Sequence, residues 1–155
     1  MLKRLLTLSI CIVALCLPTL AAPKQAPAAG PDKAYLQEIL DAWSSMNAAN
    51  VEPFYATSGD RLFFDIAPVK YNNWDEYKRG VAEVLMGYKT LKLTLNDDAQ
   101  IHHAGDLTWS AATGKFEGET TTGKHELATF RWTLVFQKTG GKWLVVHEHF
   151  SEPLQ

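Results

Sequence analysis

The sequence predicts an α+β fold in which a curved antiparallel sheet wraps over N-terminal helices. Two patterns lead to this prediction. In the first half of the chain, apolar side chains recur every three or four positions, as on the buried face of a helix. In the second half, apolar and polar residues alternate in short runs, and Gly, Asn and Asp separate the runs as in strands joined by turns. Helices followed by a series of strands are typical of an α+β domain.

Residues 1–21 have the features of a secretory signal peptide. A basic start with Lys3 and Arg4 precedes the uncharged apolar run 5–17, and small residues surround the expected cleavage after Ala21. The run is shorter than the about 20 residues that cross a bilayer. We therefore expect a flexible tether at residues 22–31 and one domain at residues 32–153. We also expect a secreted or periplasmic protein that has no membrane contact after cleavage.

The composition excludes several classes of function. Both cysteines, Cys11 and Cys16, lie within the predicted signal, so the mature chain has neither a disulfide nor a thiolate. Cleavage removes two of the 15 lysines and arginines and none of the 17 acids, which changes the net charge from −2 to −4. This charge does not favour nucleic acid or an anionic membrane as a partner. The sequence has no phosphate-binding loop, serine-centred elbow or dinucleotide fingerprint.

The first half of the predicted domain contains two helical segments. Asp32 is a suitable N-cap for a first helix, which ends within residues 47–50. Residues 51–55 predict a short second helix, because proline is tolerated in a first turn.

A strand and a further helix follow. The aromatic run 61–66 is rich in residues that favour strands. Asn73, with Glu76 three positions on, resembles a capping box and predicts a helix that ends at Gly87.

The remaining residues predict strands and turns. Residues 91–95 alternate as in a strand with one wet face, and residues 101–111 form the next strand, with a bulge at Gly105. Residues 113–124 are rich in Gly, Thr and Glu, which predicts a loop or loose hairpin. Residues 125–138 form a long strand.

The closing strand, residues 143–151, carries three ionisable side chains among apolar ones, and the preceding turn decides which of them share a face. If residues 140–141 alone form the turn, Leu134 faces His147 and Trp132 faces His149. If Thr139 joins the turn, Thr133 faces His147 and Arg131 faces His149. We favour the three-residue turn, because it leaves one strongly apolar face with Glu148 as its single carboxylate. In that register Trp143 and Val145 lie on the other face, beside the two histidines.

Three short motifs of this hairpin resemble a known family. They are Gly141-Lys142-Trp143, His147-x-His149-x-Ser151 and Arg131-x-Thr133, and together they resemble the C-terminal hairpin of SnoaL-like proteins. Those proteins belong to the superfamily of nuclear transport factor two and ketosteroid isomerase. Leu95-Asn96, Ile101-His102 and Gly105-Asp106 are similar to the association domain of calmodulin-dependent kinase, from the same superfamily. The resemblance covers roughly residues 33–153.

The resemblance implies a cone: helices close one side of the curved sheet, and a pocket opens at the wide end. It also implies a homodimer through the outer face of the sheet. In ketosteroid isomerase a carboxylate base follows the helices on an early strand, and Asp65 has a similar place here. Because this fold hosts enzymes, binding modules and oligomerisation modules, it does not define an activity.

Two carboxylates are the candidate catalytic residues. Asp65 follows three apolar residues, so burial would raise its pKa toward that of a general base; alternatively it faces solvent before Pro68. Glu148 lies among large apolar residues and must be protonated, paired with an arginine or directed at a ligand.

Other residues are candidates for binding or for holding the sheet together. Six apolar residues are expected to line a pocket for a small hydrophobic ligand: Tyr55, Phe63, Trp109, Trp132, Leu134 and Phe150. Five polar residues are expected to form a structural network or dimer face: Arg131, Thr133, His147, His149 and Ser151. We assign no metal site and no cofactor, because the His-x-His pair has no third ligand of fixed position.

Three hypotheses of function follow. The first is an exported binding or accessory protein with an apolar pocket. The second is a cofactor-free isomerase, cyclase or dehydratase with Asp65 as base and Glu148 as acid or orienting group. The third is an oligomerisation module. The enzyme hypothesis requires that the two carboxylates meet in one cavity.

Overall fold

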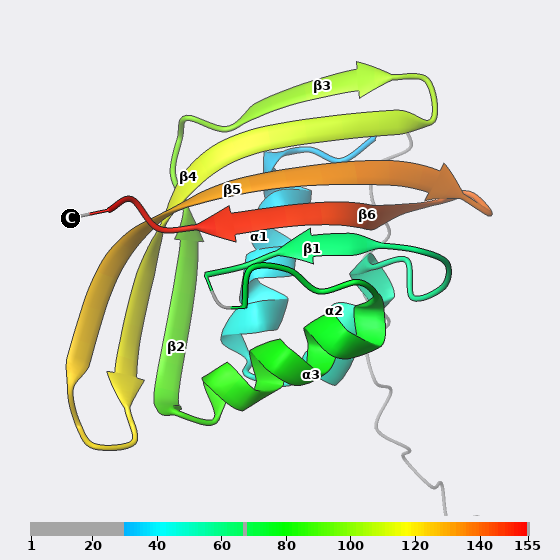
Figure 1. Ribbon diagram of the computed structural model, residues 1–155. Coiled ribbons are helices and arrows are strands. Elements are labelled where there is room, and N and C mark those ends of the chain that lie inside the picture. The colour runs from blue at the N-terminus through cyan, green and yellow to red at the C-terminus, as the bar shows by residue number, and fades with distance from the viewer. Residues whose placement is uncertain (1–29, 67, 155) are drawn as a thin grey trace, which may run out of the picture.

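The computed structural model describes residues 30–66 and 68–154, so the predicted signal peptide and most of the predicted tether lie outside the described residues. Figure 1 shows a strongly curved sheet with the helices on its concave side. This is the predicted α+β architecture. Among the described residues, no helix is long and apolar enough to cross a membrane.

The helices begin where the capping residues predict. Helix α1 (Lys33–Ser44) has Asp32 as N-cap, whose carboxylate accepts a hydrogen bond of 2.8 Å from the Tyr35 amide. Helix α3 (Trp74–Leu85) is capped by Asn73, which accepts from the Glu76 amide at 2.9 Å. The predicted short helix is present as α2 (Ala48–Val51) and the 3₁₀ turn η1 (Glu52–Phe54). Each helix turns an apolar side toward the sheet.

Within the described residues, the sheet has six strands, and one pair of them is parallel. The strands are β1 (Leu62–Phe64), β2 (Tyr88–Leu95), β3 (Gln100–Ala104), β4 (Leu107–Thr120), β5 (His125–Thr139) and β6 (Lys142–Ser151). Their order is β1-β6-β5-β4-β2, and β3 pairs with the first part of β4. Strand β1 runs parallel to β6, and all other pairs are antiparallel.

The prediction of one strand with a bulge over residues 101–111 is wrong. Gly105 has a φ of 62° and forms a two-residue turn with Asp106, so β3 ends at Ala104 and β4 begins at Leu107. A Gly-Asp pair between alternating residues is a hairpin signal, because a tight turn of this kind requires positive φ.

The prediction of a loop or loose hairpin at residues 113–124 is confirmed only at its end, where a turn after Thr120 joins β4 to β5 in a hairpin. The loop alternative is wrong for the residues before that turn. Residues up to Thr120 continue β4 and pair with both β2 and β5. The glycines that indicated a loop lie instead at close approaches within the sheet: a Cβ on Gly114 would lie 2.1 Å from Cζ of Phe130.

The β5–β6 hairpin follows neither predicted register. Residues 140–141 alone form the turn, with φ values of 57° and 78°, and Thr139 pairs with Lys142. A bulge at Val146 then shifts the pairing, so that Phe136 faces Val145 but Val135 faces His147. Beyond the bulge Thr133 faces His149 and Arg131 faces Ser151.

The bulge also changes which side chains of β6 point inward. Before it, Trp143 and Val145 are buried, in contrast to the prediction that they share a face with the histidines. After it, Glu148 is buried and only 1% exposed. The inward direction of Glu148 agrees with the favoured register, although an inserted residue produces it and not a three-residue turn.

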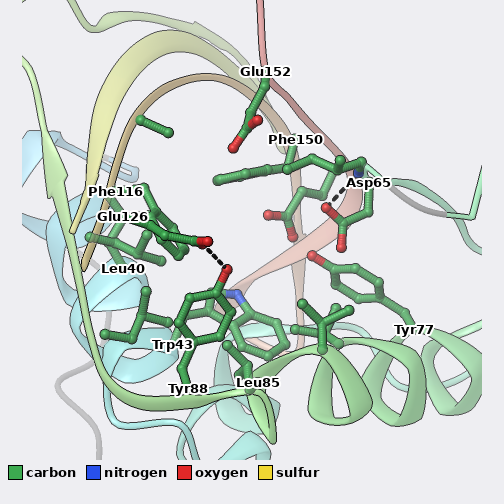
Figure 2. A pocket seen from close by; sticks show the side chains of 17 residues that line it. Leu40, Trp43, Asp65, Tyr77, Leu85, Tyr88, Phe116, Glu126, Phe150 and Glu152 are labelled. Atoms are coloured by element: carbon green, nitrogen blue, oxygen red, sulfur yellow. Dashed lines mark hydrogen bonds between the residues drawn. The ribbon is translucent and has the colours of Figure 1, made fainter. Parts of the chain in front are cut away.

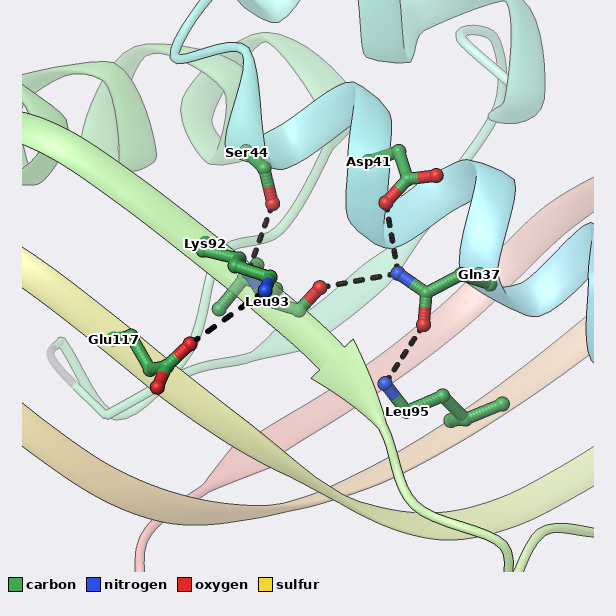
Figure 3. A network of polar contacts seen from close by, with 7 residues as sticks. All are labelled: Gln37, Asp41, Ser44, Lys92, Leu93, Leu95 and Glu117. Carbon is green, nitrogen blue, oxygen red and sulfur yellow. Dashed lines mark hydrogen bonds and ion pairs between the residues drawn. The ribbon is translucent and has the colours of Figure 1, made fainter.

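Helix α1 covers the free edge of β2, as Figure 3 shows. The Gln37 side chain donates to the Leu93 carbonyl at 3.1 Å and accepts from the Leu95 amide at 2.8 Å. The Ser44 hydroxyl accepts from the Leu93 amide at 2.9 Å. These bonds satisfy backbone groups that an edge strand would otherwise expose. They also fix α1 against the sheet at the wall of the cavity described below.

Candidate functional site

A cavity of about 160 Å³ lies between the helices and the concave face of the sheet. Its wall combines aliphatic residues of α1, α3 and β2 with five aromatic ones: Trp43, Tyr77, Tyr88, Phe116 and Phe150. Four acids complete it: Asp65, Glu126, Glu148 and Glu152. Figure 2 shows most of these side chains around a common space. The two candidate catalytic carboxylates therefore meet in one cavity.

Glu148 is held by two fixed donors. The Tyr55 hydroxyl donates to Oε2 at 2.5 Å, and the Trp132 indole N–H donates to Oε1 at 2.6 Å. Trp43 Nε1 donates to the Tyr55 oxygen at 3.0 Å, which leaves the Tyr55 proton for Glu148. This chain of three donors orients the carboxyl group and satisfies both of its oxygens.

The environment of Glu148 nevertheless disfavours its charge. Burial raises the pKa of Glu148 to about 7, although hydrogen bonding from Tyr55, Trp132 and, to a smaller extent, Tyr77 acts in the opposite direction. The negative charge of Asp65 adds to the rise. The pKa of Glu148 thus lies near neutral pH, which suits a group that exchanges a proton.

Asp65 follows β1 and lies at the side of the cavity next to Tyr77 (Figure 2). Its Oδ1 accepts a hydrogen bond of 2.7 Å from the Ile66 amide. Burial raises the pKa of Asp65 above its ordinary value, and the Ile66 amide acts against this rise. Its carboxylate is therefore a stronger base than that of an aspartate in water.

Tyr77 is a cavity residue that the sequence pattern did not single out. It lies on the buried side of α3, and its ring stacks on Phe63 with centroids 4.7 Å apart. Burial, followed by the charge of Glu148, raises its pKa well above the ordinary value, so the hydroxyl stays a donor. In Figure 2 this hydroxyl points toward the Asp65 carboxylate. In the sequence, Tyr77 looks like any core aromatic residue, so no local signal identifies it.

Only one of the six predicted pocket residues, Phe150, lines the cavity. Tyr55, Phe63, Trp132 and Leu134 are buried in the core behind it, where Tyr55 and Trp132 serve as partners of Glu148. Trp109 is 46% exposed and stacks on His102 at 4.2 Å, on the outer face of the sheet. Its neighbours in β4, Thr108 and Ser110, point inward and are buried.

The five predicted polar residues of the hairpin lie away from the cavity. His147 Nδ1 lies 2.6 Å from the Leu62 carbonyl and so connects β6 to β1. Arg131 donates to the Glu152 carbonyl at 2.8 Å. His149, Thr133 and Ser151 complete this group on the outer side of β5 and β6. Within residues 30–66 and 68–154, no group of three or more His, Cys, Asp or Glu side chains is placed to hold a metal ion.

The fold and cavity define a class of protein, the cone-shaped α+β domains with a pocket between helices and a curved sheet. Residues 33–155 match the family model of the SnoaL-like domain, and the chain belongs to this family. The chain has no match among curated protein sequences.

Solved structures support the same fold. The chain is similar to a nuclear transport factor 2-like superfamily protein from Salmonella enterica, with a TM-score of 0.70 and 17% identity. The match covers 79% of this chain and 92% of that one. A proposed calcium/calmodulin-dependent protein kinase II association domain from Xanthomonas campestris has a TM-score of 0.68 and 20% identity, and the match covers 87% and 96% of the two chains. A proposed dehydratase of the same superfamily from Streptomyces avermitilis has a TM-score of 0.65 and 16% identity, with 76% and 89% covered. At these identities the similarity concerns the fold alone.

Proposed function

We propose that this chain is an exported enzyme that binds a small, largely apolar molecule in the cavity and transfers a proton on it. Asp65 is the base, and Glu148 is the acid. The observation that carries the proposal is the meeting of two carboxyl groups, both with raised pKa, in one mostly apolar cavity. Two carboxyl groups in one cavity can serve as the base and the acid of acid–base catalysis.

The two environments suit the two roles. Burial raises the pKa of Asp65, which makes its carboxylate a stronger base, and its Oδ1 accepts the Ile66 amide. Burial raises the pKa of Glu148 to about 7, which favours a carboxyl group that still has a proton to donate. A substrate carbon next to a carbonyl would lose its proton to Asp65, and the electron pair of the broken C–H bond would form a C=C bond. The carbonyl oxygen would receive a proton from Glu148 and a hydrogen bond from Tyr77. Return of the proton from Asp65 to another carbon, with the enol proton going back to Glu148, gives an isomer. If a hydroxyl on the next carbon instead leaves as water with the proton from Asp65, the C=O bond re-forms, the enol proton returns to Glu148, and the product is dehydrated.

The dehydratase in the name of the Streptomyces avermitilis protein is consistent with such chemistry. Because that similarity concerns the fold alone, only the residues of this cavity support the proposed chemistry in this chain.

The compound 5-nitrobenzisoxazole is a test substrate for a general base in an apolar cavity. A carboxylate removes its ring C–H proton, the electron pair forms a nitrile, and the N–O bond breaks to give a coloured phenolate. We expect the Asp65→Asn variant to lose at least about 100-fold in rate, since general base catalysis contributes a factor of this order or more. The rate is measured by absorbance, and thermal unfolding is measured beside it.

Asp106→Asn is the matched control, since Asp106 is an exposed carboxylate in the β3–β4 turn. It should keep the rate of the unchanged chain. Equal rates for Asp65→Asn and the unchanged chain would show that Asp65 is not the base. A rate for the unchanged chain no higher than that of acetate in buffer would exclude the proposed enzyme function.

A binding role without turnover is the second candidate, and one observation favours it. Both oxygens of Glu148 already accept hydrogen bonds from the protein, so the carboxyl group is satisfied without a ligand. In that case a ligand would raise the melting temperature and be recovered unchanged.

A further inference from the structure

The charges around the cavity have one sign. Of the described residues that line it, none is a lysine, arginine or histidine, whereas Asp65, Glu126, Glu148 and Glu152 are acids. A ligand with a carboxylate or phosphate would bring a further negative charge into a mostly apolar cavity that has no cation on its wall. The cavity therefore selects against anionic molecules.

The acids lie on two sides of the cavity. Figure 2 shows Asp65 with Tyr77 on one side and Glu126 with Tyr88 on the other. The Tyr88 hydroxyl donates to Glu126 Oε2 at 2.8 Å, and burial together with this bond raises the pKa of Tyr88 to about 12. The hydroxyl therefore remains a neutral donor, and Glu126 keeps its charge.

Two cations, Lys124 and Arg131, contact residues of this side but do not line the cavity. Lys115 lies near Glu152 in a neighbouring hollow and does not line the cavity either. Lys124 contacts the other oxygen of Glu126 at 2.9 Å, and its side chain is 72% exposed, so water screens the pair. Arg131 donates to the backbone carbonyl of Glu152 and not to its carboxylate. In Figure 2 the Glu152 carboxylate points toward the cavity beside Phe150. The side formed by Glu126 and Glu152 thus brings two carboxylates and no cation to the cavity wall.

Aromatic rings surround the same side. Tyr88 and Phe116 are edge to face, with centroids 5.4 Å apart and planes at 72°, so they present ring faces in two directions. Phe150 lies on the cavity wall and stacks on Phe130 at 4.5 Å, which fixes its orientation. Aromatic faces next to carboxylates are the surroundings in which proteins bind alkylammonium groups.

We infer that the ligand of this cavity is an apolar amine, whose protonated nitrogen lies between Glu126, Glu152 and the rings of Tyr88 and Phe116. Its apolar body fills the aliphatic part of the cavity and extends toward Asp65 and Glu148. The inference rests on the proposed function, because it names the substrate class of the same cavity. In this arrangement Asp65 and Glu148 transfer the proton. Glu126 and Glu152, on the opposite side, make the cavity selective for a positively charged ligand.

The experiment compares three probes of similar shape, 2-phenylethylamine, 2-phenylethanol and 3-phenylpropanoate. Each is titrated into the full chain by calorimetry at neutral pH, where the amine is protonated and the acid is ionised. We expect the amine to bind at least about tenfold more tightly than the alcohol, because it adds a cation near two carboxylates and aromatic faces. The propanoate should bind more weakly than the alcohol.

Two double variants test which carboxylates cause the preference for the amine. Glu126→Gln with Glu152→Gln should reduce the affinity for the amine to about that for the alcohol, while the affinity for the alcohol stays within about twofold. Asp97→Asn with Asp106→Asn removes the same two charges from exposed turns outside the cavity. This control should keep the preference for the amine, which separates a local contact from a change of net charge.

The outcomes distinguish the two proposals. Equal binding of amine and alcohol would overturn the inference and leave the cavity as a ligand site. A preference for the amine that survives in Glu126→Gln with Glu152→Gln would also overturn it. Tighter binding of the propanoate would do the same. If none of the three probes binds, the amine inference is overturned and the cavity is excluded as a binding site.

Discussion

At the scale of single residues, Glu148 is the most informative side chain, because it is a carboxyl group in the middle of an apolar core. Leaving such a group unpaired would cost several kcal/mol. Tyr55 and Trp132 reduce this cost without removing it, since the pKa of Glu148 remains raised to about 7. The chain therefore keeps a destabilising group at the wall of a cavity, as functional sites commonly do.

The raised pKa has a consequence for stability that can be measured. The ordinary pKa of the group is 4.5, so between this value and about 7 the folded chain holds the proton more tightly than the unfolded chain. Its contribution to stability is complete below pH 4.5 and is lost as the pH rises to about 7. Since one pKa unit corresponds to about 1.4 kcal/mol, the loss is on the order of 3 kcal/mol.

We predict that Glu148→Gln removes this dependence, because an amide does not titrate. Relative to the unchanged chain, the variant should gain stability between pH 5 and pH 8, with the free energy of unfolding measured by urea at each pH. The donor that the amide leaves unpaired adds a cost that does not vary with pH. A variant with the same pH slope as the unchanged chain would contradict the burial of a titrating group at this position.

The sequence predicts the two acids of the site but not their surroundings. Asp65 and Glu148 stand out because each is a charge among apolar residues, which is a local pattern. Whether an aromatic residue lines the cavity, as Tyr77 does, or supports it, as Tyr55 and Trp132 do, depends on contacts between distant segments. Trp109 shows the same limit, since alternation along β4 does not reveal which face is the concave one.

At the scale of elements, irregular positions at Val146 and Gly114 shape the side of the sheet that faces the cavity. The bulge at Val146 turns Glu148 inward after Trp143 and Val145 have already pointed inward. Strict alternation predicts no such change, because one inserted residue leaves no signature in a run of apolar residues. The helices, in contrast, are capped by Asp32 and Asn73 and were predicted correctly because caps are local.

Gly114 is the second irregular position, and it leads to a further prediction. A Cβ there would lie 2.1 Å from Cζ of Phe130, a fully buried ring next to the cavity wall residue Phe150. We expect Gly114→Ala to destabilise the fold by about 1–3 kcal/mol, the usual cost of overpacking, as measured by urea unfolding.

Adding Phe130→Leu supplies the control, since it removes the ring atoms that the new methyl group meets. The double variant should cost less than the sum of the two single changes, as expected for residues in contact. If the two losses in the free energy of unfolding add, the close contact with Phe130 is not the reason why residue 114 must be glycine.

At the scale of the whole molecule, the cavity occupies the concave side of the sheet and the polar hairpin residues lie on the other. The outer face presents His147 and His149 beside Phe64, with ring centroids 5.5 and 5.7 Å from it, and the stack of His102 on Trp109. Trp109 and Leu107 are 46% and 49% exposed there. Exposed aromatic residues in a region with few charges are typical of the centre of an interface.

We propose a second copy of this chain as the partner of that face, as the resemblance of the hairpin to dimeric proteins implies. Sedimentation velocity should then give a dimer, and Trp109→Glu should shift it to a monomer, since it introduces a buried, unpaired charge in each copy. Val69→Glu is the matched control, because Val69 is 86% exposed in the loop between β1 and α3. It changes an apolar side chain in the same way and should leave the dimer intact. A wild-type chain that sediments as a monomer would exclude this interface, while the cavity and its acids, which lie within one copy, would remain as proposed.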